Sequence, residues 1–179
     1  MPWIWSHDQT KARKEVTDSV HVKGSSIFLQ ILALGRSAPR ALTVVEISLY
    51  IKLYVQAAKN AIEAGFDGVE KHGARGCLVD HFLQEVSNDR TDEYGGSIEN
   101  RARFLLSGPE GRVPSNRGGA SRHSALVLGV RMGMADPVPT FSYVISEIRR
   151  LHPKPAYLHL IKPKIDADPT AETAAANVA

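Results

Sequence analysis

A capped helix followed directly by a short strand, within residues 43–72, constrains the fold more than any other feature of the sequence. Thr43 and Glu46 have the spacing of a capping box, which satisfies free amide groups in the first turn of a helix. Apolar residues then recur at spacings of three and four, and Gly65 ends the pattern. The next segment, FDGVEKH, has the composition of a buried strand.

Helical and strand patterns alternate along the rest of the chain. The sequence predicts further helices over residues 6–24, 77–86, 97–106 and 139–152, and strands over residues 25–32, 124–130 and 156–161. In the first helix, we expect Ser6 or Asp8 to cap the amino end and Ala12, Val16 and Val20 to form the apolar face. Alternation of this kind is typical of parallel strands joined by helices, so the expected fold class is α/β.

The composition limits the class of protein. With 179 residues, of which 43% are hydrophobic, the chain can form one domain with a sizeable core or two small ones. Its basic residues are scattered, so a nucleic-acid-binding module, a weaker alternative, has only the pI near 9.1 in its favour. The single cysteine excludes an intramolecular disulfide and favours a reducing compartment. Because the sequence has neither a long apolar run nor a secretory signal, we expect a cytoplasmic protein with no membrane or nucleic-acid partner.

Two polar residues end predicted strands, Gln30 in the segment SIFLQ and His72 in FDGVEKH. Because the carboxyl ends of parallel strands meet at one rim, we expect these side chains to flank a shared cavity mouth. Arg75 and Cys77 follow in a glycine-rich turn, so the rim could hold an active site or form an ordinary surface turn. For Gln30 alone, tying down a loop is an equally good interpretation, and His72 alone could be a structural histidine.

A known family shares this part of the sequence. Residues 57–104, and above all the segment SNDRTDEYGGSIENR at residues 87–101, resemble the old yellow enzyme family of FMN-dependent NAD(P)H:flavin oxidoreductases and ene-reductases. The resemblance extends over residues 2–106 and 132–165, and it is strongest with fungal members. It implies a (β/α)8 TIM barrel that binds FMN at its carboxyl-end rim. The implied reaction passes a hydride from NAD(P)H through FMN to an activated alkene, an enal or enone.

The resemblance also implies roles for the four rim residues. Gln30 matches the glutamine that hydrogen-bonds the flavin ring, and His72 matches the first donor to the substrate carbonyl oxygen. Arg75 stands at the second donor position, where the family has Asn or His, so the motif here is H-x-x-R. Cys77 stands where most members have a proton-donating Tyr, and packing under the short helix is the alternative for its thiol. No metal is implied.

Other departures predict a partial barrel that is incomplete at both ends. Arg36 and Pro39 are nearly adjacent where the family has a longer segment, and Lys162 replaces an acid. The family's phosphate-binding elements are expected beyond Ala179, and its first strand upstream of this sequence. Residues 107–131 match nothing in the family, which suggests a shifted reading frame or a misjoined exon. We therefore expect barrel segments at residues 1–106 and 132–165, an irregular segment at 107–131 and a disordered tail at 166–179.

Two interpretations of function follow from a partial barrel. The chain could be an old-yellow-enzyme-type oxidoreductase acting on a small alkene. Alternatively, it could be an inactive remnant or a gene-model fragment of such an enzyme that binds no flavin. In either case, unpaired strand edges would favour self-association.

Overall fold

Four parallel strands form the sheet of the described residues. The computed structural model describes residues 4–35, 40–107, 123–129, 134–151 and 156–161. Within these residues the strands follow the order β1-β2-β3-β4, and each neighbouring pair is parallel. Their bounds are β1 Phe28–Ile31, β2 Gly68–Gly73, β3 His123–Gly129 and β4 Leu158–Ile161. This order is the one that successive β/α units of a barrel produce.

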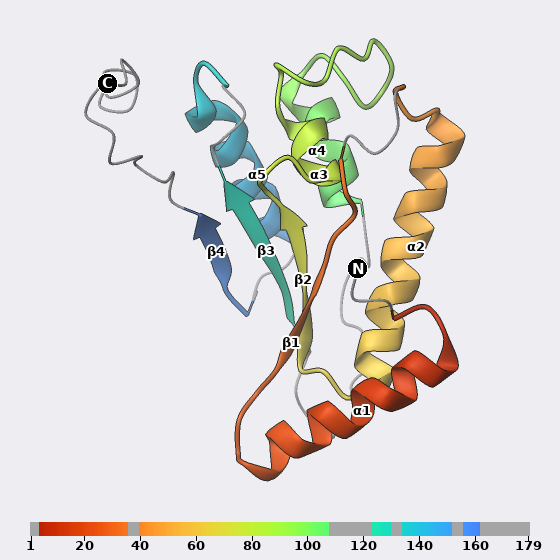
Figure 1. The fold of residues 1–179 in the computed structure, drawn as a ribbon. Coiled ribbons are helices and arrows are strands. Elements are labelled where there is room, and N and C mark those ends of the chain that lie inside the picture. Colours follow the sequence, from red (N-terminus) through yellow and green to blue (C-terminus); the bar gives the residue numbers. More distant parts are fainter. Residues whose placement is uncertain (1–3, 36–39, 108–122, 130–133, 152–155, 162–179) are drawn as a thin grey trace, which may run out of the picture.

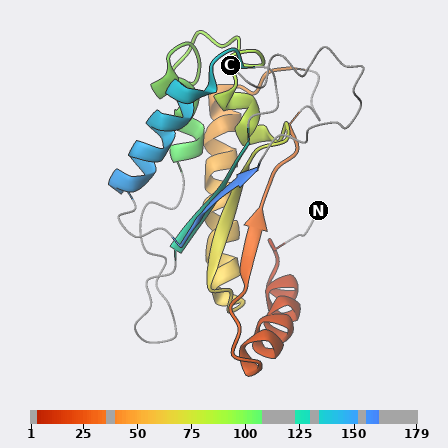
Figure 2. The same ribbon diagram turned by 90° about the vertical axis from the view of Figure 1, so that its left-hand side faces the viewer.

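In the described part of the chain, five helices separate or flank these strands (Figure 1). They are α1 His7–Val22, α2 Val44–Glu63, α3 Leu78–Leu83, α4 Ile98–Leu106 and α5 Pro137–Leu151. Figure 2 shows α2, α4 and α5 on the same side of the sheet, and α1 at the end where β1 begins. The described helices therefore leave the opposite face of the sheet uncovered.

The caps of α2 form as the sequence predicts. Thr43 Oγ1 accepts a hydrogen bond from the Glu46 amide at 3.2 Å, and the Thr43 amide donates to Glu46 Oε2 at 2.7 Å. At the other end, Gly65 adopts a φ of 93°, in the left-handed region that favours glycine. The buried side of α2 faces the sheet through Ile47, Tyr54, Ala58, Ala61 and Ile62.

The predicted apolar face of α1 is wrong, although Ser6 does cap its amino end. Val16 is 49% exposed, whereas Thr17 is fully buried and donates from Oγ1 to the carbonyl oxygen of Ala64 at 2.6 Å. A Cβ on Gly65 would lie 2.8 Å from the Thr17 hydroxyl. α1 therefore contacts the end of α2 closely through a polar residue, and its apolar stripe stays outside.

Two clusters of buried residues hold the helices to the sheet. The larger one comprises Ile47, Tyr54, Leu78, Val79, Phe82, Leu83, Tyr94, Ala102, Phe104, Leu105 and Val144. The smaller one lies under β1 and the end of α2 and comprises Ile4, Leu29, Ala58, Ala61, Ala64, Phe66 and Val69. Burial of this apolar surface supplies most of the driving force for assembling the layers.

Lys71 reaches from β2 into the helix layer rather than into solvent. Its Nζ donates to the carbonyl oxygens of Phe104, Leu105 and Ser107 at 3.2, 2.8 and 2.7 Å. These carbonyl groups are at the carboxyl end of α4, where the helix itself provides no further amide donors. Nζ also lies 5.1 Å from the centre of the Tyr54 ring. The half-buried lysine therefore serves as a cap for the carboxyl end of α4.

The described strands form half of the eight that close a barrel. Within the described part of the chain, β1 and β4 each pair on one side only. In the segment 107–131, residues 123–129 form β3, close to the strand expected at 124–130, whereas 108–122 and the predicted tail lie outside the described residues. None of the described helices is both long enough and apolar enough to cross a membrane.

Candidate active site

Strand register brings Gln30 and His72 onto one face of the sheet. Gln30 pairs with Glu70, and His72 lies two residues further along β2. Alternate residues of a strand share a face, so Gln30, Glu70 and His72 point to the same side. His159 of β4 joins them, because β3 aligns it with His72. This is the face opposite Leu29 and Val69, which pack in the helix layer.

Glu70 links three strands through this face. Gln30 Nε2 donates to Glu70 Oε2 at 2.6 Å, and His159 Nδ1 lies 3.0 Å from Glu70 Oε1. Glu70 is only 7% exposed, whereas half of the His159 side chain is accessible. Burial and the neighbouring Glu70 raise the pKa of Tyr157, which stacks edge-on against Phe28. The sequence pattern did not single out Glu70 or His159 as site residues.

His72 is a buried histidine with an unused ring nitrogen. The residue is 7% exposed, and its Nδ1 has no hydrogen-bond partner among the described residues. Burial lowers the pKa of the imidazole below its ordinary value, so the ring is neutral at pH 7. A neutral ring carries one N–H donor. Because buried polar groups rarely lack partners, this nitrogen is suited to a bound molecule.

Arg75 lies in a strained turn at the end of β2. Its φ is 56°, in the left-handed region that non-glycine residues rarely adopt, and Gly76 follows with a φ of 71°. The side chain is exposed, and the described part of the chain offers it no ion pair or hydrogen bond. Its positive charge contributes to lowering the pKa of His72. A cation near the histidine is therefore available to a ligand.

Cys77 begins α3 but does not cap it. The residue is at the N-cap position, and its side chain makes no capping hydrogen bond. Burial raises the pKa of the thiol, and the nearby Asp80 carboxylate acts in the same direction. Asp80 is fully buried and accepts from the Gly76 amide and from Gln84 Nε2 at 2.8 and 2.9 Å. Asp80, which sequence reasoning missed, thus fixes the turn that carries Arg75.

The most characteristic segment of the sequence, residues 87–101, has a structural role in the described residues. Asn88 Nδ2 donates to the carbonyl oxygens of Phe82 and Tyr94 at 2.7 and 2.8 Å. Arg101 is buried and donates from Nε to the Leu83 carbonyl oxygen at 3.1 Å. The segment thereby clamps α3, which follows directly from the turn that carries Arg75.

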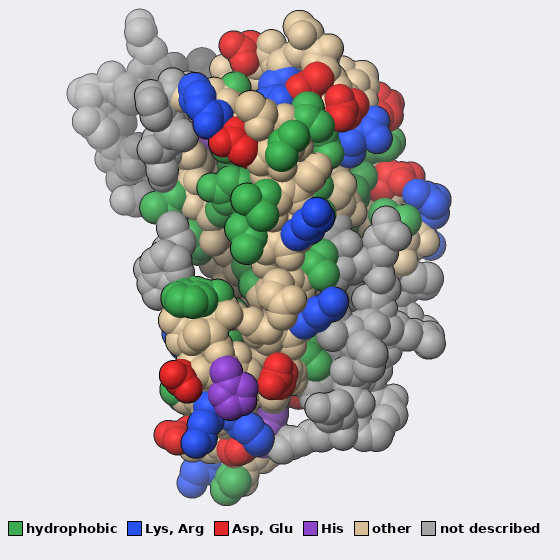
Figure 3. All heavy atoms as spheres, turned by 90° about the vertical axis from the view of Figure 1, so that its right-hand side faces the viewer, with side chains coloured by type: hydrophobic (Ala, Val, Ile, Leu, Met, Phe, Trp, Pro, Cys, Tyr) green, Lys and Arg blue, Asp and Glu red, His purple; other side chains and the backbone are tan. Residues whose placement is uncertain are grey.

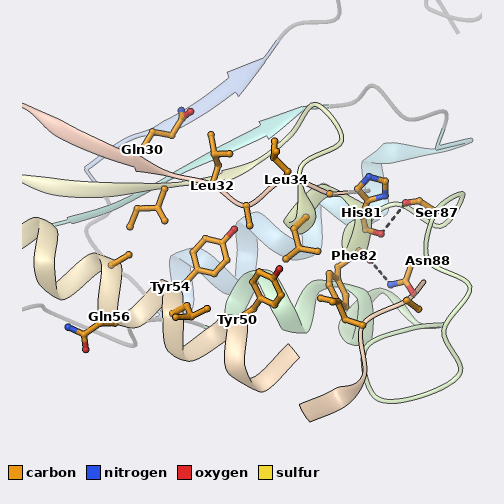
Figure 4. A pocket seen from close by; sticks show the side chains of 18 of the residues that line it. Gln30, Leu32, Leu34, Tyr50, Tyr54, Gln56, His81, Phe82, Ser87 and Asn88 are labelled. Atoms are coloured by element: carbon orange, nitrogen blue, oxygen red, sulfur yellow. Dashed lines mark hydrogen bonds between the residues drawn. The ribbon is translucent and has the colours of Figure 1, made fainter. Parts of the chain in front are cut away.

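A large groove lies on the other side of β1. Its volume is about 1040 Å³, and it is lined by residues of β1, α2 and α3. Gln30 borders it, but His72, Arg75 and Cys77 do not. Figure 4 shows Tyr50 and Tyr54 inside the groove and the Gln30 side chain pointing away from them. The predicted shared cavity mouth is therefore not found here: Gln30 and His72 share a face, but the groove adjoins only Gln30.

The outer side of α2, next to this groove, is unusually apolar. Val45, Leu49 and Leu53 are 79%, 54% and 52% exposed and recur every four residues. Figure 3 shows hydrophobic side chains at the surface on this side of the molecule.

Comparison with known proteins identifies the family. The model of the NADH:flavin oxidoreductase / NADH oxidase family matches residues 37–166, which is more than half of the chain. The chain belongs to this family. The old-yellow-enzyme resemblance of the sequence is therefore confirmed, and the cofactors of the family are FMN and NAD(P)H.

Similar fungal proteins extend over about twice the length of this member. The NADP-dependent oxidoreductase lnbE of Aspergillus flavus is 40% identical over 198 residues, covering 94% of this chain and 52% of its own. The chanoclavine-I aldehyde reductase ifgG of Penicillium roqueforti is 43% identical, covering 89% and 50%. The probable inactive dehydrogenase easA of Claviceps purpurea is 42% identical, covering 97% and 53%. The chain thus spans about half the length of the curated relatives it matches.

Solved structures of the family agree with the fold. Morphinone reductase superposes with a TM-score of 0.79 at 31% identity, covering 92% of this chain and 55% of its own. The old yellow enzyme homologue from Zymomonas mobilis gives a TM-score of 0.73 at 29% identity, covering 89% and 54%. The prediction of a partial TIM barrel is therefore confirmed.

Proposed function

We propose that this chain provides part of an FMN-dependent oxidoreductase that transfers a hydride from NAD(P)H to a small activated alkene, an enal or enone. The observation that carries the proposal is the common face of Gln30 and His72 at the ends of two parallel strands, with the His72 Nδ1 buried and unused by the described residues. Family membership supports it, as does the name of one fungal relative, an aldehyde reductase.

The residues on this face fit the ring of a flavin. Gln30 uses Nε2 to bind Glu70, which leaves its carbonyl oxygen for a ligand. The unused His72 nitrogen lies on the same face and is left for the substrate. When bound, FMN would supply the storage and transfer of the hydride. In this proposal Gln30 holds the ring through its pyrimidine edge.

The other residues would act on the substrate. Neutral His72 donates its N–H to the carbonyl oxygen, and Arg75 is the second donor. Both stabilise the negative charge that develops on that oxygen. Because a guanidinium is permanently charged and longer than an amide, Arg75 favours substrates with room around the carbonyl. The raised pKa keeps the Cys77 thiol protonated, so it could supply a proton to the α-carbon, though less effectively than a Tyr.

A flavin-free remnant is the competing function. Its support is the four-stranded sheet of the described residues, with β1 and β4 paired on one side only. One relative from Claviceps purpurea and one from Epichloe festucae carry names that call them probable inactive enzymes. The boundaries expected for the barrel segments, the cytoplasmic location and self-association through strand edges all remain predictions.

Flavin titration of the purified 179-residue chain tests the proposal. We expect FMN fluorescence to be quenched on binding, and Gln30→Ala to weaken binding about tenfold through loss of one hydrogen bond in a desolvated site. His72→Ala should leave FMN binding within twofold but slow the NADPH-dependent reduction of 2-cyclohexenone at least about tenfold. His7→Ala, on the exposed surface of α1, is the matched control.

Two results would contradict the proposal. Failure of the wild-type chain to bind FMN would favour the remnant. Alkene reduction unchanged by His72→Ala would remove the carbonyl-donor role.

A further inference from the structure

The hydrogen bonds of Glu70 have a consequence for Gln30. The Glu70 carboxylate is almost completely buried, and its hydrogen-bond partners are Gln30, His159 and the side chain of Tyr157. Oε2 faces Gln30 Nε2 at 2.6 Å, and Oε1 faces His159 Nδ1 at 3.0 Å. Three strands therefore contribute to one hydrogen-bonded row. The proposed function uses Glu70 only as the partner of Gln30 Nε2, and it does not use His159.

An ionised carboxylate can only accept hydrogen bonds. The end of the Gln30 side chain that faces Glu70 must therefore be the NH2 group, because the amide oxygen would repel the carboxylate. The same argument requires His159 to carry a hydrogen on Nδ1. Glu70 thus selects one of the two orientations that a glutamine amide could otherwise adopt. Among the described residues, no donor then remains for the carbonyl oxygen of Gln30.

We propose that Glu70 is a positioning residue, which orients the Gln30 amide so that its oxygen accepts a hydrogen bond from the imide N–H of a bound isoalloxazine ring. The inference rests on the proposed function, since it takes Gln30 as the residue that binds the ring. His159 holds the second carboxylate oxygen and so keeps Glu70 from rotating away. With its oxygen exposed in this way, Gln30 should bind ligands that present a hydrogen-bond donor more tightly than ligands that present an acceptor.

The substitution Glu70→Gln isolates this role. A glutamine at position 70 keeps the size and the hydrogen bonding of the side chain, but it presents both an acceptor and a donor. Gln30 can then bind it in either orientation. Glu63→Gln, on the exposed surface of α2, removes the same charge away from the site and serves as the matched control.

Side-chain NMR of the ligand-free chain gives the first readout. In the wild-type protein and in Glu63→Gln, we expect one set of Gln30 NH2 signals, with one proton shifted downfield and protected from exchange. In Glu70→Gln we expect a second set or averaged signals. A single protected set that persists in Glu70→Gln would overturn the proposal.

Affinity for FMN and for N3-methyl-FMN gives the second readout, and a merely structural role would not affect their ratio. The methylated flavin lacks the imide N–H, so the wild-type chain should bind it about tenfold more weakly than FMN. In Glu70→Gln the ratio should fall to within about threefold. An unchanged ratio in this variant, or no discrimination by the wild type, would overturn the positioning role. If the wild type binds neither flavin, the proposed function fails, and the ligand-free NMR spectra alone decide whether Glu70 orients Gln30.

Discussion

Asn88 donates a hydrogen bond from Nδ2 to the carbonyl oxygen of Tyr94 at 2.8 Å and so links the two ends of the loop at residues 88–94. The same nitrogen donates to the carbonyl oxygen of Phe82 at the end of α3. One buried side chain therefore satisfies two main-chain acceptors that helix and sheet leave unpaired. The segment with the most recognisable sequence in this chain owes part of its composition to such backbone contacts.

Replacement of Asn88 by Ala should destabilise the fold. Two buried carbonyl oxygens would lose their donor, which costs roughly 1–3 kcal/mol of unfolding free energy. Urea unfolding followed by circular dichroism measures the change. Asn100→Ala, which removes an exposed hydrogen bond with Arg103, should change the free energy by less than about 0.5 kcal/mol. Equal effects of the two substitutions would show that the clamp is unimportant.

The half-buried Lys71 should make the free energy of unfolding depend on pH above neutrality. Burial lowers the pKa of its ammonium group to about 7, compared with 10.5 for a free lysine. Between these values the unfolded chain binds the proton and the folded chain releases it. The free energy of unfolding should therefore rise as pH increases from about 7 to about 10.5, by an amount on the order of a few kcal/mol.

Lys71→Met provides the check, because it removes the titrating group from the helix layer. Its free energy of unfolding, measured in urea at a series of pH values, should lack this rise. Lys59→Met, at an exposed position of α2, should retain it. A wild-type stability that falls over the same range would mean that the carbonyl oxygens around Nζ outweigh the cost of burying its charge.

The substitution Arg75→Asn should raise the free energy of unfolding and should maintain or increase alkene reduction. Asn tolerates the left-handed region better than Arg, so we expect a gain of about 0.5 kcal/mol in unfolding free energy. Asn also keeps a side-chain donor, so alkene reduction should be maintained or increased. Arg75→Ala keeps the strain and loses the donor. It should therefore show no stability gain and slower reduction, and equal stability of the two variants would contradict the backbone argument.

Cys77→Ser should stabilise α3. The residue already has extended N-cap geometry, with φ −70° and ψ 165°, but its thiol makes no capping bond. A serine hydroxyl can accept from the Asp80 amide, so Cys77→Ser should exceed Cys77→Ala in thermal stability by about 1 kcal/mol. Differential scanning calorimetry of both variants measures this difference. Identical melting temperatures of the two variants would mean that the cost of burying the serine hydroxyl offsets the gain from its capping hydrogen bond.

Local chemistry was predictable because it involves residues close together in the chain. The caps at Ser6, Thr43 and Ser97 each bind an amide three residues away, so the sequence pattern contains all the participants. The same holds for the glycine that ends α2, because its conformation depends on the missing Cβ. The strands and helices were found in the predicted order for this reason.

Packing and pairing depended on the assembled sheet. Val16 fits an apolar stripe in α1, yet Thr17 is the buried residue, because the end of α2 offers a carbonyl oxygen instead of an apolar surface. Glu70 and His159 are 89 residues apart and meet only through the register of three strands. No local pattern encodes such a contact. The caps, the order of elements, the family and the common face of Gln30 and His72 therefore follow from sequence patterns, whereas the contacts of Glu70 with Gln30 and His159 depend on how the strands pair in the assembled sheet.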